Sequence, residues 1–356
     1  MRRLVRFLLL KPILWFIHNF TSSPDRQRIF SALSTLRERI ENDPGQKGFV
    51  IPLTATGRYI LFSDQHKGIK NGADDFMLAE PNYVQALTYY NSRGFHLICL
   101  GDSEELWENT LIQVKKHNTA SFNAERKFAS RGAFTKIFGN HDLDWEINPT
   151  SSLDLKTLYG TDIAVLEGIM LIGSIEGKDL KIFCTHGHQG DAQSDGNLFS
   201  KFFVSKIWAP LQAYLRINPN TPAYDVSLKT EHNNLMYEWS SHQKDLLLIT
   251  GHTHQPVFES LTHLERVQRQ EASMQQENLL SDKSVNDKAI VNHFAKIKPS
   301  YFNTGCCCYD DGDITGIEID GGYIKLIKWE QRNGKSGRLE LERISLASVA
   351  QKLSTP

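Results

Sequence analysis

Polar residues of the kinds that bind metal ions follow several short hydrophobic runs in this sequence. The segment FSDQH contains Asp64 and His66, and the segment LGDSEELWE contains Asp102. Carboxylate, amide and imidazole donors bind divalent ions such as Mn, Fe, Zn or Ni. A structural zinc site would instead contain cysteine thiolates, which these segments do not place among the donors. Three further segments, FGNHD, FCTHGHQGD and ITGHTHQP, supply the other candidates, which are Asn140, His141, Asp142, His186, His188, His252 and His254.

The number of these donors indicates two metal ions. Seven of them are predicted to be ligands, which is too many for one tetrahedral ion. If one carboxylate bridges, these seven divide into two sets of four and leave positions open for water and substrate. We favour His186 as a ligand because it directly follows a hydrophobic run. His188 is expected not to bind metal itself but to donate a hydrogen bond to one of the ligands. Asp142 is predicted to fix its turn or orient a histidine. The predicted metal ligands are Asp64, His66, Asp102, Asn140, His186, His252 and His254.

The hydrophobic runs before the candidates are predicted strands, because they are short and alternate with helical patterns. This alternation predicts an α/β (α+β) layered fold, and its strand ends would bring the candidates into one crevice. Predicted helices cover residues 27–41, 74–91 and 104 to about 116. Predicted strands cover residues 58–63, 95–100, 134–138, 163–166, 169–172, 180–185, 245–250, 301–304, 314–320 and 323–329.

Several residues beside the candidates are given supporting roles. Lys67 is expected to be solvated, with contact to a substrate phosphate as the alternative. Glu104, Glu105 and Glu108 are expected at the start of a helix, where acidic residues suit the helix dipole. Three glycines precede candidate ligands and permit sharp turns, at positions 101, 139 and 251.

We divide the chain into an N-terminal helical segment 1–45, a main domain 46–345 and a C-terminal tail 346–356. Two helical insertions are expected within the main domain, at about 192–243 and 258–298. The first insertion is rich in aromatic residues. These are predicted to pack helices together, and a hydrophobic substrate cleft is the alternative.

The blocks D-x-H, GD, GNH[DE], H and GH-x-H resemble the motif set of the calcineurin-like metallophosphoesterase superfamily. All of them occur in order between about residues 59 and 256. Their coincidence is specific, although each block alone would be weak. The resemblance implies a β-sandwich flanked by helices. It also implies hydrolysis of a phosphate ester or pyrophosphate by a hydroxide that bridges two divalent ions, with Mn favoured and Fe, Zn or Ni as alternatives.

The resemblance also implies a role for each matched residue. Asp102 would bridge the two ions and belong to the catalytic machinery. His141 matches the family's catalytic histidine, which would stabilise the transition state and protonate the leaving group. One ion would be held by Asp64, His66, Asp102 and His254, and the other by Asp102, Asn140, His186 and His252.

The segments GDSEELWE and HGHQGD resemble a narrower branch, the UDP-2,3-diacylglucosamine pyrophosphohydrolases of lipid A synthesis. The third block of that branch has Asn-Arg, whereas this chain has Asn140-His141, the pair found in general phosphatases and phosphodiesterases. We therefore expect a metal-dependent phosphoric ester hydrolase acting on a phosphorylated small molecule or lipid-nucleotide. The alternatives are a nucleotide-sugar-lipid pyrophosphohydrolase and a non-catalytic, membrane-associated binding module on the same fold.

Composition excludes several other classes of protein. The chain has 356 residues, 40% of them hydrophobic, which is typical of a globular protein and not of a disordered or multi-span membrane chain. Its 40 Lys+Arg and 41 Asp+Glu give a formal charge of −1. No overall positive field would therefore attract nucleic acid, and no nucleic-acid partner is expected.

Two segments bear on cellular location. Residues 1–24 are basic and apolar, but Arg6, Lys11 and Pro12 interrupt the run needed for a spanning helix. We expect either peripheral membrane contact through residues 1–20 or a helix packed on the domain. The run Cys306–Cys308 is predicted to be small buried residues, with a metal or redox role as the minority alternative. These features favour a cytoplasmic protein, with contact at the inner face of the membrane left open.

Overall fold

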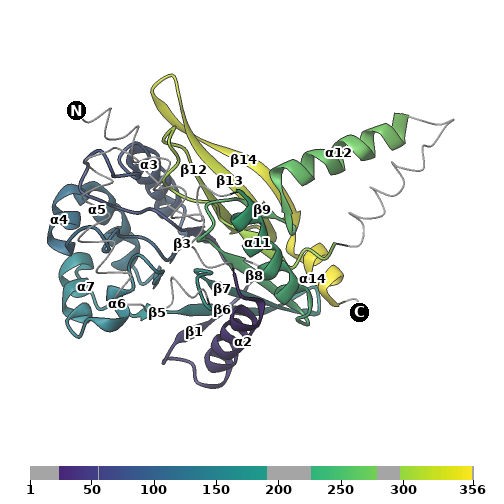
Figure 1. The fold of residues 1–356 in the computed structure, drawn as a ribbon, viewed down its shortest axis with the longest axis horizontal. Helices are drawn as coiled ribbons and strands as arrows, with labels where there is room; N and C mark the ends of the chain where they lie inside the picture. Colours follow the sequence, from purple (N-terminus) through teal and green to yellow (C-terminus); the bar gives the residue numbers. More distant parts are fainter. Residues whose placement is uncertain (1–23, 55, 191–225, 279–296, 355–356) are drawn as a thin grey trace, which may run out of the picture.

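Two mixed β-sheets of seven strands each form the centre of the protein. The computed structural model describes residues 24–54, 56–190, 226–278 and 297–354. Figure 1 shows the sheets lying against each other, with helices on their outer sides. This arrangement confirms the predicted α/β layered fold and its central sandwich.

The first sheet carries the short strands that precede the aspartate and asparagine candidates. Its β2, β3, β4 and β5 are parallel, and β12, β13 and β14 extend it as an antiparallel ribbon. The sequence of β2, YILF, is buried throughout, as expected for a strand covered on both faces. In spatial order the strands are β14 (Lys335–Ser345), β13 (Tyr323–Arg332), β12 (Ile314–Asp320), β2 (Tyr59–Phe62), β3 (His96–Leu100), β4 (Phe134–Ile137) and β5 (Val165–Leu166).

The second sheet carries the strands that precede His186, His188, His252 and His254. Its β7 and β8 are parallel neighbours, so their carboxyl ends lie at the same edge. In spatial order the strands are β1 (Gly48–Pro52), β6 (Gly168–Ile175), β7 (Lys178–Thr185), β8 (Leu246–Thr250), β11 (Tyr301–Asn303), β9 (Val257–Phe258) and β10 (Leu261–Thr262).

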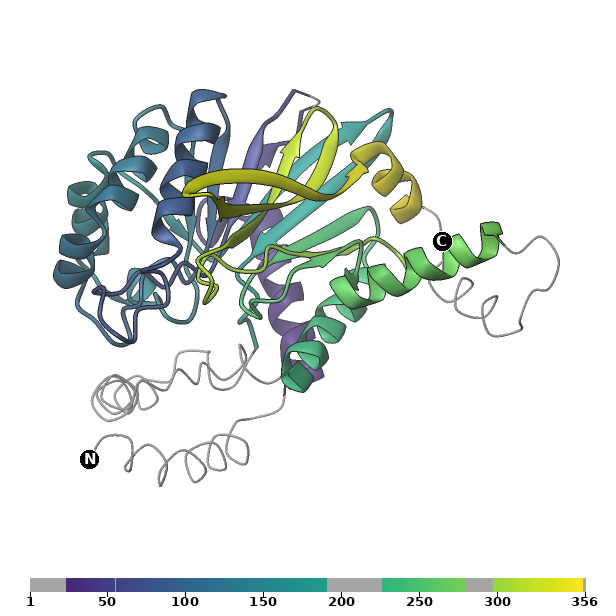
Figure 2. The ribbon, with the colours of Figure 1, turned by 90° about the horizontal axis from the view of Figure 1, so that it is seen from above.

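Helices cover the outer faces of both sheets, as the two views in Figures 1 and 2 show. Helices α3 (Glu80–Ser92) and α5 (Thr119–Ala129) pack on the first sheet. Helices α2 (Arg26–Asn42) and α11 (Val226–Ser241) pack on the second sheet through residues such as Ile29 and Trp239. The other described helices are α4 (Leu111–His117), α6 (Asp144–Ile147), α7 (Ser151–Tyr159), α12 (His263–Asn278) and α14 (Leu346–Ser354).

The predicted elements agree with the structure at the buried strands and differ at polar segments. Helix α3 begins at Glu80 instead of residue 74, because the Asp74 carboxylate accepts the backbone N–H groups of Lys70 and Phe76 and holds a turn. The expected helix from 104 to 116 is wrong in its first part, where Lys67 and Glu104 form a β-bridge. A helix forms only from Leu111, after a capping box at Thr110.

The flanking segments differ in how far the structure describes them. The segment 346–356, expected as a tail, contains α14, and Val349 and Leu353 of this helix are buried in the inter-sheet core. Helices α11 and α12 lie within the expected insertions, whereas residues 191–225 and 279–296 lie outside the described residues, as does the predicted membrane-contact segment 1–20. In the described part of the chain, no helix combines the length and hydrophobicity needed to cross a bilayer.

Ile317 tests the inter-sheet core. This residue of β12 is fully buried between the sheets, so Ile317→Ala should lower the free energy of unfolding by about 2–5 kcal/mol through lost burial and a residual cavity. Ile112 in α4 is 81% exposed, and Ile112→Ala should change the same quantity by less than about 0.5 kcal/mol. Urea unfolding of both variants measures the difference. Equal losses would contradict the assignment of this core.

Candidate metal centre

All seven predicted ligands come from loops at the carboxyl ends of five strands. Asp64 and His66 follow β2, Asp102 follows β3 and Asn140 follows β4, all in the first sheet. His186 follows β7, and His252 and His254 follow β8, in the second sheet. The centre is therefore assembled by both halves of the sandwich.

One group of donors surrounds the Oδ1 atom of Asp64. His254 Nε2 lies 3.3 Å from this oxygen, and His66 Nε2 lies 3.9 Å from it. The two ring nitrogens are 3.3 Å apart. Donors bound to one zinc-sized ion at about 2.1 Å stand at comparable separations, so these three side chains are placed to share an ion.

A second group surrounds the Oδ2 atom of Asp102. His186 Nε2 lies 3.2 Å from this oxygen and 3.2 Å from Asn140 Oδ1. His252 completes a buried three-residue group with Asp102 and His186. His66 Nε2 lies 3.7 Å from the same Asp102 oxygen, so this carboxylate stands between the two groups as a bridging ligand would.

Contacts behind the ligands aim their donor atoms into the centre. Asp64 Oδ2 accepts the backbone N–H of His252 at 3.0 Å, whereas its buried Oδ1 accepts no hydrogen bond from the described residues. His186 Nδ1 lies 2.7 Å from the carbonyl of Leu100, which assigns a proton to Nδ1 and makes Nε2 the nitrogen that faces Asp102. The orphaned oxygen and the oriented ring fit a divalent ion.

The ligand loops have strained backbones. A left-handed φ in a non-glycine residue costs of order 1–3 kcal/mol and persists only where the surroundings enforce it. Two glycines allow the loops to approach closely, since a Cβ at Gly139 would lie 2.2 Å from Asp102 Oδ1 and one at Gly251 would lie 2.5 Å from Asp64 Oδ2. Positive φ occurs at Asp64 (53°), His66 (49°), Asp102 (49°), His252 (69°) and His254 (55°).

Asp142 ties two of these loops together. Its Oδ1 accepts the N–H of Gly139 at 2.6 Å, and its Oδ2 accepts the N–H of Ser103 at 2.8 Å. This confirms that Asp142 fixes its turn. His188 is buried beside His186, with ring centroids 5.3 Å apart, and its Nδ1 has no hydrogen-bond partner among the described residues.

Glu105, which the sequence predicted only at a helix start, contacts two candidate histidines of the centre. Its carboxylate contacts His66 Nδ1 at 2.9 Å and His141 Nδ1 at 2.8 Å. It therefore orients a predicted ligand and the predicted catalytic histidine together. Its position three residues after Asp102 was the available signal, but that spacing alone does not identify a partner.

His141 lies at the open side of the centre. Its side chain is 16% exposed, whereas that of Asp102 is 3% exposed. Its ring stacks on Trp107 with centroids 4.6 Å apart and an interplanar angle of 17°. Trp107 also lines a groove of about 490 Å³ together with Leu111 and Trp145. The histidine is thus placed where the metal centre meets solvent.

Charged neighbours shift the pKa values of several groups in the centre. Burial opposes charge on His66, but Glu105 and Asp102 raise the pKa of its imidazole to about 9. Burial also opposes charge on His186, and Asp102 raises the pKa of this imidazole to about 9. Burial also opposes charge on Glu105, yet His141 and His66 lower the pKa of its carboxyl to about 2. Protons on the histidines thus balance the carboxylates, and a bound cation would replace them.

Lys67 and Glu104 are buried and form ion pairs, which differs from the roles predicted for them. Lys67 is fully buried and pairs with Glu125 at 2.7 Å and Glu104 at 3.3 Å, so it is neither solvated nor placed to meet a substrate. Glu104 pairs with the buried Lys136 at 2.7 Å and accepts the indole N–H of Trp145 at 2.8 Å. Glu104 is therefore held by ion pairs with two buried lysines.

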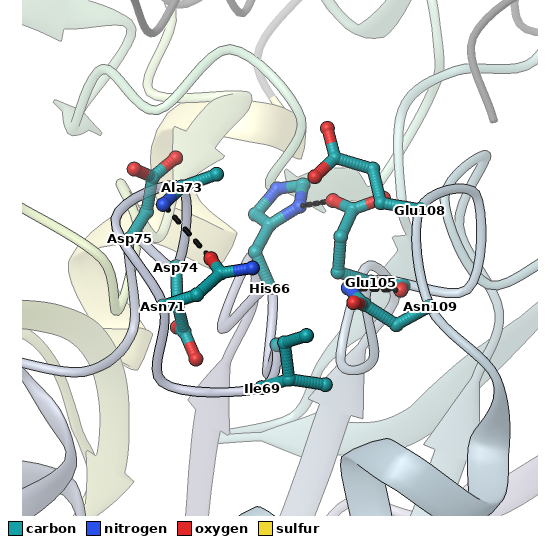
Figure 3. Close-up of a pocket in the computed structure, with 10 residues that line it drawn as sticks. His66, Ile69, Asn71, Ala73, Asp74, Asp75, Glu105, Glu108 and Asn109 are labelled. Atoms are coloured by element: carbon teal, nitrogen blue, oxygen red, sulfur yellow. Dashed lines mark hydrogen bonds and ion pairs between the residues drawn. The ribbon is translucent and has the colours of Figure 1, made fainter. Parts of the chain in front are cut away.

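An acidic pocket opens beside His66. Figure 3 shows the ring of His66 between the Asp74–Asp75 loop and the segment that carries Glu105 and Glu108. Burial, followed by the charges of Glu105 and Asp75, raises the pKa of Glu108 to about 8, so this acid is largely protonated at neutral pH.

Comparisons with known proteins give only weak matches. No family model matches the chain, and no curated protein matches it significantly. Among solved structures, vacuolar protein sorting 29 from Cryptosporidium parvum shares 14% identity over 81% of this chain and 98% of its own, with a TM-score of 0.33. Vps29 complexed with Zn²⁺ from Entamoeba histolytica shares 11% identity over 81% and 98%, with a TM-score of 0.28. Similarity at this level supports no functional assignment.

Glu105→Gln should weaken metal binding about 10–100-fold, because His66 loses the charged partner that orients it. Glu108→Gln is a matched control, since it replaces a neighbouring acid that is already mostly protonated. Its metal affinity should stay within about twofold of the wild type. Titration of the chelated protein with Mn²⁺ measures both, and equal affinities in the two variants would remove the role of Glu105.

Lys136→Met should destabilise the protein by about 3–5 kcal/mol, because it leaves Glu104 charged and buried with fewer partners. Lys352 is 52% exposed and pairs with Glu259 at 3.3 Å, so Lys352→Met should cost no more than about 1 kcal/mol. Urea unfolding at neutral pH compares the two. A loss at Lys136 as small as that at Lys352 would contradict a buried structural ion pair.

Proposed function

We propose that this protein is a dinuclear-metal phosphoesterase that hydrolyses a phosphate ester or pyrophosphate. The observation that carries the proposal is the convergence of seven donor side chains in two neighbouring groups, one at Asp64 and one at Asp102, with His141 at the open side. Two divalent cations held by these donors would bind phosphoryl oxygens and acidify a water molecule. We propose Asp64, His66, Asp102 and His254 for one ion, Asp102, Asn140, His186 and His252 for the other, and Mn as the preferred metal.

The chain's own residues would position the substrate and transfer a proton. Glu105 accepts a hydrogen bond from His141 Nδ1, so Nε2 is the atom left to protonate the leaving oxygen. Trp107 fixes the plane of the imidazole by stacking. A charged imidazole near the phosphoryl group would also stabilise negative charge that develops in the transition state.

The surroundings of His141 leave room for a leaving group. The groove beside Trp107 is lined by apolar residues such as Leu111 and Trp145 and by a larger number of polar and acidic residues, among them Gln113 and Asp144. It would hold the organic part of a phosphorylated small molecule or lipid-nucleotide. Hydrolysis of a nucleotide-sugar-lipid pyrophosphate is a narrower proposal for the same site. We also propose membrane contact through residues 1–20 and a cytoplasmic location at the inner face of the membrane.

His141→Ala should lower kcat by about 10²–10⁴-fold while two metal ions remain bound, because proton donation is lost and the ligands are kept. Asp102→Asn should lower both metal content and kcat, since it removes the charge shared by the two donor groups. The control His242→Ala changes an exposed histidine in the turn directly after α11 and should leave both quantities unchanged. Metal analysis and turnover of a generic aryl phosphate measure these effects.

The substrate class is tested on one Mn²⁺-loaded sample of the full chain. A phosphomonoester, a phosphodiester and a nucleotide-sugar pyrophosphate are compared at equal concentration, and turnover of at least one is expected. Two tightly bound metal ions without turnover of any of the three would overturn the enzymatic proposal. That result would favour the non-catalytic binding module.

A further inference from the structure

Two cysteines lie against the far side of His254. Cys308 Sγ is 3.7 Å from His254 Nδ1, the ring nitrogen that does not face Asp64. Cys306 Sγ completes the group, and the three ligand atoms all lie within 4.8 Å of one another. None of the seven predicted ligands other than His254 belongs to this group. The group contains sulfur donors, which the main centre lacks.

The backbone holds these cysteines in place beside the main centre. The N–H of Cys307 donates to the carbonyl of Asp64 at 3.1 Å, and the N–H of Thr315 donates to the carbonyl of Cys306 at 3.0 Å. Both thiol-bearing residues of the group are buried, with exposures of 1% for Cys306 and 7% for Cys308. The sulfur atoms are therefore fixed by the fold, and little rearrangement is needed to bring them onto one ion.

The separations suit a small ion bound by two sulfurs and one nitrogen. With metal–sulfur bonds of about 2.3 Å and a metal–nitrogen bond of about 2.1 Å, the donors of a tetrahedral site stand roughly 3.5–3.8 Å apart. The observed separation of 3.7 Å between Cys308 Sγ and His254 Nδ1 falls in this range. Three protein donors leave the fourth position open.

We propose that Cys306, Cys308 and His254 form a third metal site that selects a soft or borderline ion such as Zn²⁺, Cd²⁺ or Cu⁺. Thiolates favour such ions over Mn²⁺ or Mg²⁺, which prefer oxygen donors. Binding breaks two S–H bonds, forms two metal–sulfur bonds and releases two protons to solvent. The lone pair of His254 Nδ1 supplies the third bond, and the imidazole proton then resides on Nε2, toward Asp64.

The shared histidine couples this site to the main centre. A neutral imidazole has one lone pair, which can face either the cysteines through Nδ1 or Asp64 through Nε2. A soft ion at the cysteines would therefore compete with the ion held by Asp64 and His66. The inference does not rest on phosphoester hydrolysis, because it depends only on metal binding.

The remaining cysteines provide controls within the same chain. Cys307 points into the core between the first sheet and α3, where its Sγ lies 3.8 Å from the carbonyl of Thr315. Cys99 and Cys184 are buried in hydrophobic clusters. Cys307→Ser thus changes a neighbouring thiol without touching the proposed donors.

The test is a Cd²⁺ titration of the chelated, reduced, full-length protein, followed by the ultraviolet charge-transfer absorption of thiolate–Cd²⁺ bonds. One thiolate-bound Cd²⁺ per chain is expected for the wild type and for Cys307→Ser. Cys306→Ser and Cys308→Ser should each weaken this binding by at least about tenfold. Cadmium NMR of the wild type should independently show a resonance typical of two sulfur ligands, so the test does not depend on the variants folding.

The outcomes separate this inference from the proposed function. Absence of the absorption band in the wild type, or a band of unchanged affinity in both Cys306→Ser and Cys308→Ser, would overturn the third site. Such a result would leave Mn²⁺ binding and turnover untouched. Because His254 is shared, Cd²⁺ should also displace more Mn²⁺ from the wild type than from Cys308→Ser. Equilibrium dialysis measures this displacement, and equal displacement from the two proteins would refute the coupling.

Discussion

The burial of two carboxylates, Asp64 and Asp102, is the constraint around which the centre is organised. A buried negative charge is costly unless cations and hydrogen-bond donors surround it. Asp64 receives a backbone N–H from His252, and Asp102 receives one from His141. Histidine rings occupy their remaining sides. The loops that carry these donors must therefore converge, and the sheets beneath them must present five strand ends at one place.

This convergence depends on unfavourable backbone geometry. Five of the seven predicted ligands have left-handed backbones, and the Asp142 carboxylate and the glycines stabilise the turns. Below them, Glu104, Lys67 and Lys136 form buried ion pairs that resist movement. Rigidity of this kind keeps donor atoms within the narrow range of separations that a metal ion tolerates.

The sequence predicted the features that are local and failed for those that depend on distant partners. Asp64, Asp102 and His186 each follow a hydrophobic run closely, so strand patterning alone places them at strand ends. Glu105 was assigned to a helix start because its partners His66 and His141 are 39 and 36 residues away. For the cysteine run the sequence offered a metal role only as the minority alternative, since three adjacent cysteines match no metal-binding spacing and His254 is 54 residues from Cys308.

The division of the donors between two sheets links metal occupancy to the integrity of the whole sandwich. Asp64, Asp102 and Asn140 belong to one sheet, whereas His186 and His252 belong to the other. An ion bound by ligands from both sheets would link the sheets to each other. Separation of the sheets would divide its ligands, so the ion would bind only the folded sandwich. Its binding free energy would thus add to the cooperative unfolding free energy of the complete core. Metal supply would then govern how long the folded chain persists.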